Sequence, residues 1–86
     1  MRKIDLSRMT SREAEEARAR RPVVLIPVGT VEQQGPHCPL GADGIMGEQF
    51  ARRVAEATDS LVVPTIPYGY SEGFASYCGT IWLRAS

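Results

Sequence analysis

The sequence has no net charge and no long hydrophobic run. Its 10 basic and 10 acidic residues cancel, so electrostatic capture by nucleic acid or by an anionic membrane has no support. No apolar run approaches the roughly 20 residues that cross a bilayer. Residues 1–21 are polar and charged, unlike a secretory signal with its apolar centre, and a cytoplasmic location is therefore expected.

Cysteine is scarce, and the common nucleotide-binding motifs are missing. Cys38 and Cys78 form no C-x-x-C pair, and two such residues in a cytoplasmic chain are expected to be free thiols. Cys38 beside His37 suggests a thiol nucleophile or a zinc ligand, but adjacent residues of an extended segment point to opposite faces. The stretch 29–35 makes neither G-x-G-x-x-G nor a P-loop, so nucleotide binding has little support.

One loop, residues 32–43, does concentrate chemically useful side chains. It reads Glu-Gln-Gln-Gly-Pro-His-Cys-Pro-Leu-Gly-Ala-Asp and holds two carboxylates, Glu32 and Asp43, with the only histidine of the chain, His37. Its prolines restrict φ and its glycines permit turns, so the loop can hold these three side chains in one arrangement. A metal ligand must be in place before the ion arrives, and the loop is therefore a candidate metal or hydrolytic site.

The flanking segments predict a β-α-β unit. The apolar, β-branched run 23–28 is typical of a strand covered on both faces, and residues 61–66 form a second such run after a turn at 58–60. Between them, residues 44–57 have the spacing of an amphipathic helix with an apolar face of Ile45, Met46, Phe50, Val54 and Ala57. The right-handed crossover rule makes the two strands parallel.

The remaining elements are a surface helix and a long loop. A capping box, Thr10-x-x-Glu13, predicts a helix over residues 11–20 that ends before Pro22. Residues 68–78 are a Gly- and aromatic-rich loop, and 80–83 are a candidate third strand. The loop 32–43 then lies at the C-terminal edge of a strand, where open α/β sheets bind ligands. Asp43 stands at a helix start, where a carboxylate accepts backbone N–H bonds and faces the positive end of the dipole.

These motifs resemble the signature of the creatininase (creatinine amidohydrolase) family. The stretch 24–43 is similar to P-[VL]-G-[ST]-x-E-Q-H-G-P-H-L-P-L-x-x-D. Residues 63–71 and 79–81 are similar to the family segments P-x-[IL]-P-Y-G-x-S and G-T-[IV]-S-L, in the same order. Three linked matches cover most of residues 22–83, so the resemblance is not a chance match.

The resemblance implies a three-layer α/β/α sandwich with a mostly parallel sheet, of which residues 1–86 form a single partial domain, the N-terminal β-α-β portion. It implies a metal-dependent hydrolase that cleaves a C–N bond of a small cyclic or acyl amide, or a related carbonyl compound, with a metal-activated water. The cofactors would be two divalent ions, zinc or manganese.

Residue by residue, Glu32 matches a ligand of one ion and Asp43 matches the carboxylate that bridges both. Gln34 departs from the family pattern, which has a histidine ligand there, and its amide offers only a weak carbonyl oxygen. His37 matches a histidine close to the site, a candidate for substrate or proton handling. The further ligands of the family have no counterpart here. A β-α-β unit alone would also expose sheet edges and one sheet face, so association with a C-terminal portion, or a homo-oligomer, is expected.

Each of these interpretations has a simpler alternative. Glu32 and Asp43 also fit a loop carboxylate and a helix cap, and His37 also fits a hydrogen bond to the loop backbone. The aromatic residues between 68 and 82 fit packing, although the resemblance places Tyr70 or Ser71 near substrate. The alternative function is a non-catalytic binding or scaffolding relative, or an inactive fragment, that has lost part of the dinuclear site at Gln34.

Overall fold

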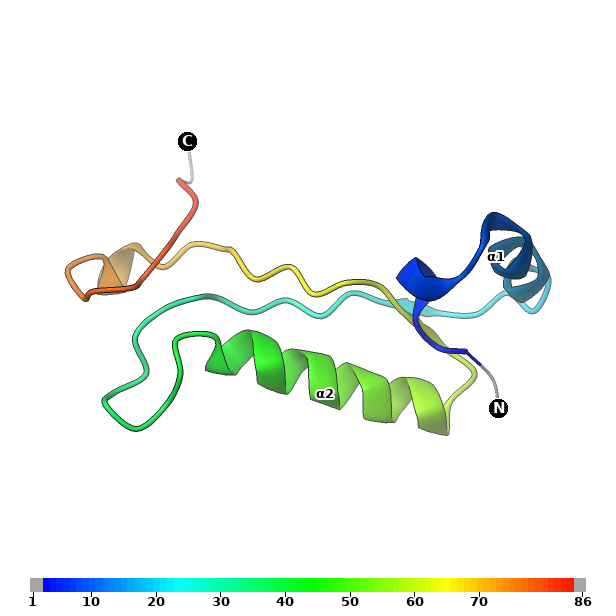
Figure 1. The fold of residues 1–86 in the computed structure, drawn as a ribbon, viewed down its shortest axis with the longest axis horizontal. Coiled ribbons are helices and arrows are strands. Elements are labelled where there is room, and N and C mark those ends of the chain that lie inside the picture. Colours follow the sequence, from blue (N-terminus) through cyan, green and yellow to red (C-terminus); the bar gives the residue numbers. More distant parts are fainter. Residues whose placement is uncertain (1–2, 85–86) are drawn as a thin grey trace.

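The computed structural model describes residues 3–84, which form a parallel strand pair with one long helix packed along it (Figure 1). The long helix α2 lies on one side of the strands, while the short helix α1 sits at the end near the N-terminus. In chain order the elements are η1 (Leu6–Arg8), α1 (Ser11–Arg18), β1 (Val24–Leu25), α2 (Ala42–Ala57), β2 (Leu61–Val62) and η2 (Glu72–Phe74).

The predicted β-α-β unit with parallel strands is confirmed. Val24 pairs with Leu61 and Leu25 with Val62, both in parallel register. The sheet also has an edge that the sequence did not predict, because Asp5 forms a parallel bridge with Val62 on the side away from β1. The N-terminal segment thus contributes to the sheet, although the sequence predicted no element for residues 1–10.

Both strands are shorter than predicted because proline interrupts their ladder. Regular pairing stops after Leu25 and Val62 and resumes only at an isolated bridge between Val28 and Ile66. Pro27 and Pro64 lie in the gap, and neither has an N–H to donate. Val63 donates to the carbonyl of Leu25 and Ile66 to that of Pro27, so the segment that follows β2 has one more residue than the segment that follows β1. Such an extra residue is a bulge, which ends regular pairing.

Helix α2 packs on the strands through small residues rather than through its large apolar ones. Ala51 and Ala55 are buried against Ile4 and Val62 in the core, with Leu25 packed beside them. A Cβ built on Gly47 would lie 3.4 Å from the Val28 carbonyl oxygen. The predicted apolar face is wrong, because its largest members, Ile45, Met46 and Phe50, are exposed. Short side chains occupy the inner face of α2 because only they let the helix lie this close to the strands.

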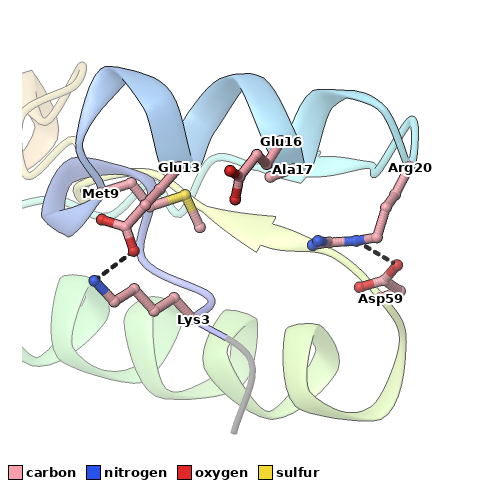
Figure 2. Close-up of a pocket in the computed structure, with 7 residues that line it drawn as sticks. All are labelled: Lys3, Met9, Glu13, Glu16, Ala17, Arg20 and Asp59. Carbon is pink, nitrogen blue, oxygen red and sulfur yellow. Dashed lines mark hydrogen bonds and ion pairs between the residues drawn. The ribbon is translucent and has the colours of Figure 1, made fainter.

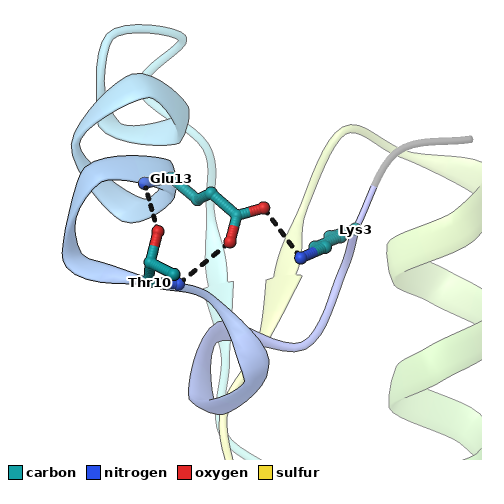
Figure 3. A network of polar contacts seen from close by, with 3 residues as sticks. All are labelled: Lys3, Thr10 and Glu13. Carbon is teal, nitrogen blue, oxygen red and sulfur yellow. Dashed lines mark hydrogen bonds and ion pairs between the residues drawn. The ribbon is translucent and has the colours of Figure 1, made fainter.

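Helix α1 begins at the predicted capping box (Figure 3). The Thr10 hydroxyl accepts from the Glu13 N–H at 3.1 Å, and the Glu13 carboxylate accepts from the Thr10 N–H at 3.1 Å. The Lys3 ammonium, 2.7 Å from Glu13, and the Thr10 N–H hold the pKa of the Glu13 carboxyl below its usual range. The helix ends at Arg18, two residues before the predicted end, and Arg21 has a left-handed φ of 53°.

The predicted third strand over 80–83 is not formed. Ile81 makes only an isolated antiparallel bridge with Val31. The loop 68–78 is irregular as predicted, apart from η2. Within residues 3–84, no helix combines the length and apolarity needed to cross a membrane.

Candidate metal centre

Three side chains of the predicted site meet at the C-terminal end of the strand pair. The Gln34 Nε2 donates to Glu32 Oε1 at 3.4 Å and to Asp43 Oδ2 at 3.2 Å. All three residues are half-buried. The structure thus brings Glu32, Gln34 and Asp43 together, and one nitrogen atom lies between the two carboxylates.

Asp43 does not cap the helix, contrary to the alternative interpretation of the sequence. Helix α2 starts at Ala42, its N-cap is Gly41, and no side-chain cap hydrogen bond is formed there. Asp43 lies in the first turn and directs Oδ2 to the Gln34 amide and to the Thr30 hydroxyl, which donates at 3.1 Å. Its negative charge still lies at the positive end of the helix dipole, but Oδ2 accepts hydrogen bonds from Thr30 and Gln34 and not from the helix backbone.

Two glycines allow the loop and the helix to approach each other at this point. A Cβ on Gly29 would lie 2.3 Å from the Gly44 nitrogen, a distance that real contacts do not reach. A Cβ on Gly69 would lie 3.3 Å from Thr30 Cγ2. Because Gly29 has no side chain, the start of α2 can lie against the strand end. Because Gly69 has none, there is room for Thr30, which binds Asp43.

The segment 79–83 braces the loop that carries Glu32 and Gln34. The Gln33 N–H donates to the Thr80 hydroxyl at 3.2 Å, and the Ile81 N–H donates to the Val31 carbonyl at 2.9 Å. Gly79, at φ 91°, stands so close to Leu40 that a Cβ there would lie 2.4 Å from Leu40 Cδ1. The motif Gly79-Thr80-Ile81 therefore positions the loop that carries Glu32 and Gln34, although it forms no regular strand.

His37 and Cys38 do not join this cluster. Among residues 3–84 no hydrogen bond links His37 to Glu32, Gln34 or Asp43, and its ring lies over Gly35, where a Cβ would be 3.1 Å from Nδ1. Cys38 and Cys78 are free cysteines, as predicted.

The donor set has the chemistry that a small divalent cation prefers. Two carboxylate oxygens converge on one polar atom, and hard oxygen donors suit Mg²⁺ or Mn²⁺, while carboxylates also bind zinc. Within the described range 3–84, however, three or more His, Cys, Asp or Glu side chains nowhere gather in a group able to hold an ion. Glu32 and Asp43 alone therefore do not make a closed ion site, which would need further ligands.

Sequence reasoning missed Thr30 and Thr80, the two hydroxyl residues that hold the cluster. Their signal was present, because both belong to the family-like motifs, but a threonine in a loop has no spacing that reveals its partner. Ser71 is buried and its Oγ has no partner among the described residues. The structure thus gives the last position of the Pro-Tyr-Gly-x-Ser motif an unsatisfied polar atom, which a polar ligand would complete.

A hollow of about 550 Å³ at the opposite end of the molecule is a weaker candidate site (Figure 2). Arg20 contacts Asp59 at 3.1 Å across one side, and Lys3 pairs with Glu13 across the other. These pairs are exposed, so each contributes little. These four charged side chains already pair with one another. They do not form a group of like charges that would attract a ligand of opposite charge. Its lining is Lys3, Met9, Glu13, Glu16, Ala17, Arg20 and Asp59.

Comparison with known proteins gives one consistent result. The sequence model of the family Creatininase, described as creatinine amidohydrolase, matches residues 7–86. The mycofactocin precursor peptide peptidase of Mycolicibacterium smegmatis is 38% identical over 66 residues, which are 70% of this chain and 27% of that protein. Creatinine amidohydrolase of Pseudomonas putida is 40% identical over 48 residues, 56% of this chain and 18% of that protein. The 3-dehydro-scyllo-inosose hydrolase of Thermotoga maritima is 36% identical over 62 residues, 72% and 20% of the two chains.

Solved structures agree with the sequence comparison. A creatininase in its Mn form superposes with a TM-score of 0.88 at 30% identity, over 96% of this chain and 35% of that one. A mutant creatininase of Zn-Zn type gives 0.87 at 31% identity, over 96% and 34%. This chain has the α/β fold of these structures and corresponds to their N-terminal β-α-β portion. It spans about a third of the solved chains and 18 to 27% of the three relatives above.

Proposed function

Since this chain belongs to the creatininase family, we propose that it is part of a metal-dependent hydrolase that cleaves a C–N bond of a small cyclic or acyl amide, or acts on a related carbonyl compound. The single observation that carries the proposal is the convergence of Glu32 Oε1 and Asp43 Oδ2 on one atom at the strand ends. Two half-buried carboxylates with one neutral donor between them form a site of high negative charge, and a divalent cation matches it.

The residues of this chain have separate roles in the proposal. Glu32 and Asp43 hold the ions, and Thr30 fixes the rotamer of Asp43 by donating to it. Such a neighbour orients a ligand before the ion arrives. The exposed His37, at the rim of the loop, handles substrate or a proton. Bound zinc or manganese would polarise the substrate carbonyl and activate water for attack.

The relatives support hydrolysis, and they leave open whether the substrate is an amide or another carbonyl compound. One is named an amidohydrolase, one a peptidase and one the hydrolase of an inosose. The solved neighbours of Zn-Zn type and Mn form support zinc or manganese as the cofactor. A small amide or a related carbonyl compound is therefore the substrate class that we propose.

Location and association complete the proposal. We place the protein in the cytoplasm and expect it to need further chain or other copies, because its sheet is covered on one face only. Val24, Ile26 and Val28 alternate along the first strand segment, and with Ile66 they expose an apolar face opposite α2. A face of this kind is normally buried in a folded α/β protein.

Chelation of the protein that contains this chain tests the proposal. Metal content is measured by elemental analysis, and hydrolysis of creatinine and of a short peptide amide is measured before and after EDTA treatment. We expect zinc or manganese in the purified protein, loss of hydrolysis on chelation and recovery on readdition of the ion. Hydrolysis that persists in metal-free protein would refute metal dependence.

The second candidate is a non-catalytic relative or inactive fragment. It is favoured by one observation, the Gln34 amide that satisfies both carboxylates without an ion. Protein that carries no ion, and that gains none in millimolar zinc or manganese, would favour this candidate over the enzyme.

A further inference from the structure

We propose that Gln34 is an internal competitor of the cation rather than one of its ligands. Its side-chain NH₂ occupies the space between Glu32 and Asp43, so an ion enters only after this amide has turned away. The inference rests on the proposed function, because it concerns the same acidic pair.

The contacts make the amide and the ion mutually exclusive. Nε2 lies 3.4 Å from Glu32 Oε1 and 3.2 Å from Asp43 Oδ2, and it donates to both. An amide nitrogen is only a donor, with hydrogens that point at the two oxygens. A cation placed between the same oxygens would meet those hydrogens, so the two occupants cannot be present together.

The chemistry of the three side chains explains why the amide faces inward with its nitrogen. Ionised Glu32 and Asp43 only accept hydrogen bonds, and an NH₂ group supplies two donors for two acceptors. The opposite amide orientation would bring three acceptor oxygens together with no proton among them. The nitrogen-inward orientation is therefore the stable one without an ion.

This arrangement reverses the effect expected from removing the amide. As a ligand through Oε1, Gln34 would strengthen ion binding, and its loss would weaken it. As a competitor, Gln34 weakens ion binding, since the ion must first break two charge-assisted hydrogen bonds. The sign of the change in affinity thus separates the two roles.

Titration of the metal-free protein that contains this chain, with Mn²⁺ or Zn²⁺ alone, measures that sign by calorimetry. We expect Gln34→Met, which keeps the length and removes the amide, to bind the first ion about tenfold more tightly, the size of one hydrogen bond to a charged group. Gln34→Ala should change the affinity in the same direction. The matched control is Gln33→Met, since Gln33 accepts from the Gly35 N–H at 3.0 Å and does not contact the carboxylates. It should leave the affinity unchanged.

Thermal unfolding gives a second readout that needs no ion. Gln34→Met should lower the Tm of metal-free protein more than Gln33→Met does, because Glu32 and Asp43 then face each other without a donor, and added Mn²⁺ should remove this difference. Weaker ion binding by Gln34→Met would overturn the competitor role while leaving the proposed metal site intact. An absence of ion binding in wild type and in Gln34→Met, Gln34→Ala and Gln34→His would overturn the metal site itself, and the competitor role with it.

Discussion

A single oxygen, Asp43 Oδ2, accepts more hydrogen bonds than any other atom of the cluster. It accepts from the Thr30 hydroxyl at 3.1 Å and from the Gln34 amide at 3.2 Å, whereas Glu32 Oε1 accepts only the longer bond from Gln34. Thr30 lies at the strand end and Asp43 in the first turn of α2, so this oxygen joins two elements. The two carboxylates are therefore not equivalent.

This asymmetry predicts unequal effects of neutralising each carboxylate. Asp43→Asn should lower ion affinity by about 100-fold or more, beyond the effect of losing an outer-shell partner, while Glu32→Gln should deplete one ion and leave the other partly bound. The amide introduced by Asp43→Asn keeps an oxygen that can accept from Thr30, so circular dichroism should stay unchanged. Calorimetric titration with Mn²⁺ in the protein that contains this chain measures both affinities.

The outcome also tests the simpler interpretation of Asp43. If Asp43→Asn binds ions as tightly as wild type and hydrolyses substrate at the same rate, the metal-site hypothesis fails at its central residue. Asp43 would then be a structural link between Thr30 and the loop.

At this scale the sequence pointed to the loop that carries Glu32 and Gln34 and to Asp43, but not to how these side chains bond, and it placed His37 among them. Glu32, Gln34 and Asp43 were identifiable because carboxylates in a stiff loop have few roles, and because the motif fixes their spacing. The direction of the Gln34 amide depends on which acceptors surround it, and those come from two elements folded together. The helix-cap role of Asp43 failed because α2 begins at Ala42, one residue earlier, with Gly41 as its N-cap.

Among the elements, α2 decides the geometry of the site through its small residues. These residues recur at spacings of three and four along the helix and are Gly44, Gly47, Ala51 and Ala55. Periodicity in the sequence favoured the large apolar residues as the inner face, yet Phe50 is 71% exposed. Hydrophobicity alone could not reveal this, since close approach depends on side-chain size at the contact.

Gly29→Ala tests the close approach of the strand end and α2. The added Cβ would lie 2.3 Å from the Gly44 nitrogen and 2.7 Å from the Asp43 carbonyl carbon, so backbone must move. Overpacking of this kind costs about 1 to 3 kcal/mol of unfolding free energy, and displacement of the first turn of α2 should also weaken ion binding. Urea denaturation of the protein that contains this chain measures the first effect.

The matched control for this change is Gly73→Ala, because no atom beyond the adjoining residues lies within 4 Å of a Cβ at Gly73. It should change the unfolding free energy by much less. Equal stability of Gly29→Ala and wild type would show that the strand end and α2 are not held as closely as the structure has them.

As a whole molecule, the chain buries little. Among residues 3–84 few apolar side chains are buried, and half of these are alanines. No large side chain there is less than 2% exposed. The long axis extends 47 Å against 17 Å for the shortest, a flat and elongated shape. The sequence predicted the reason correctly, since a β-α-β unit alone leaves one sheet face uncovered. It could not predict that the outer side of α2 would be apolar as well.

The last prediction concerns residues 1–86 prepared alone. We expect oligomers or aggregates in sedimentation velocity and a broad thermal transition, because Val28 is 60% and Ile66 47% exposed on the uncovered sheet face and unpaired strand edges invite association. Val28→Thr with Ile66→Thr should reduce this self-association, since threonine keeps the β-branched shape and adds a hydroxyl. Phe50→Ser, on the outer side of α2, is the comparison that separates the two apolar surfaces. A monomer with a sharp, cooperative transition would show that this portion folds without its uncovered face being buried.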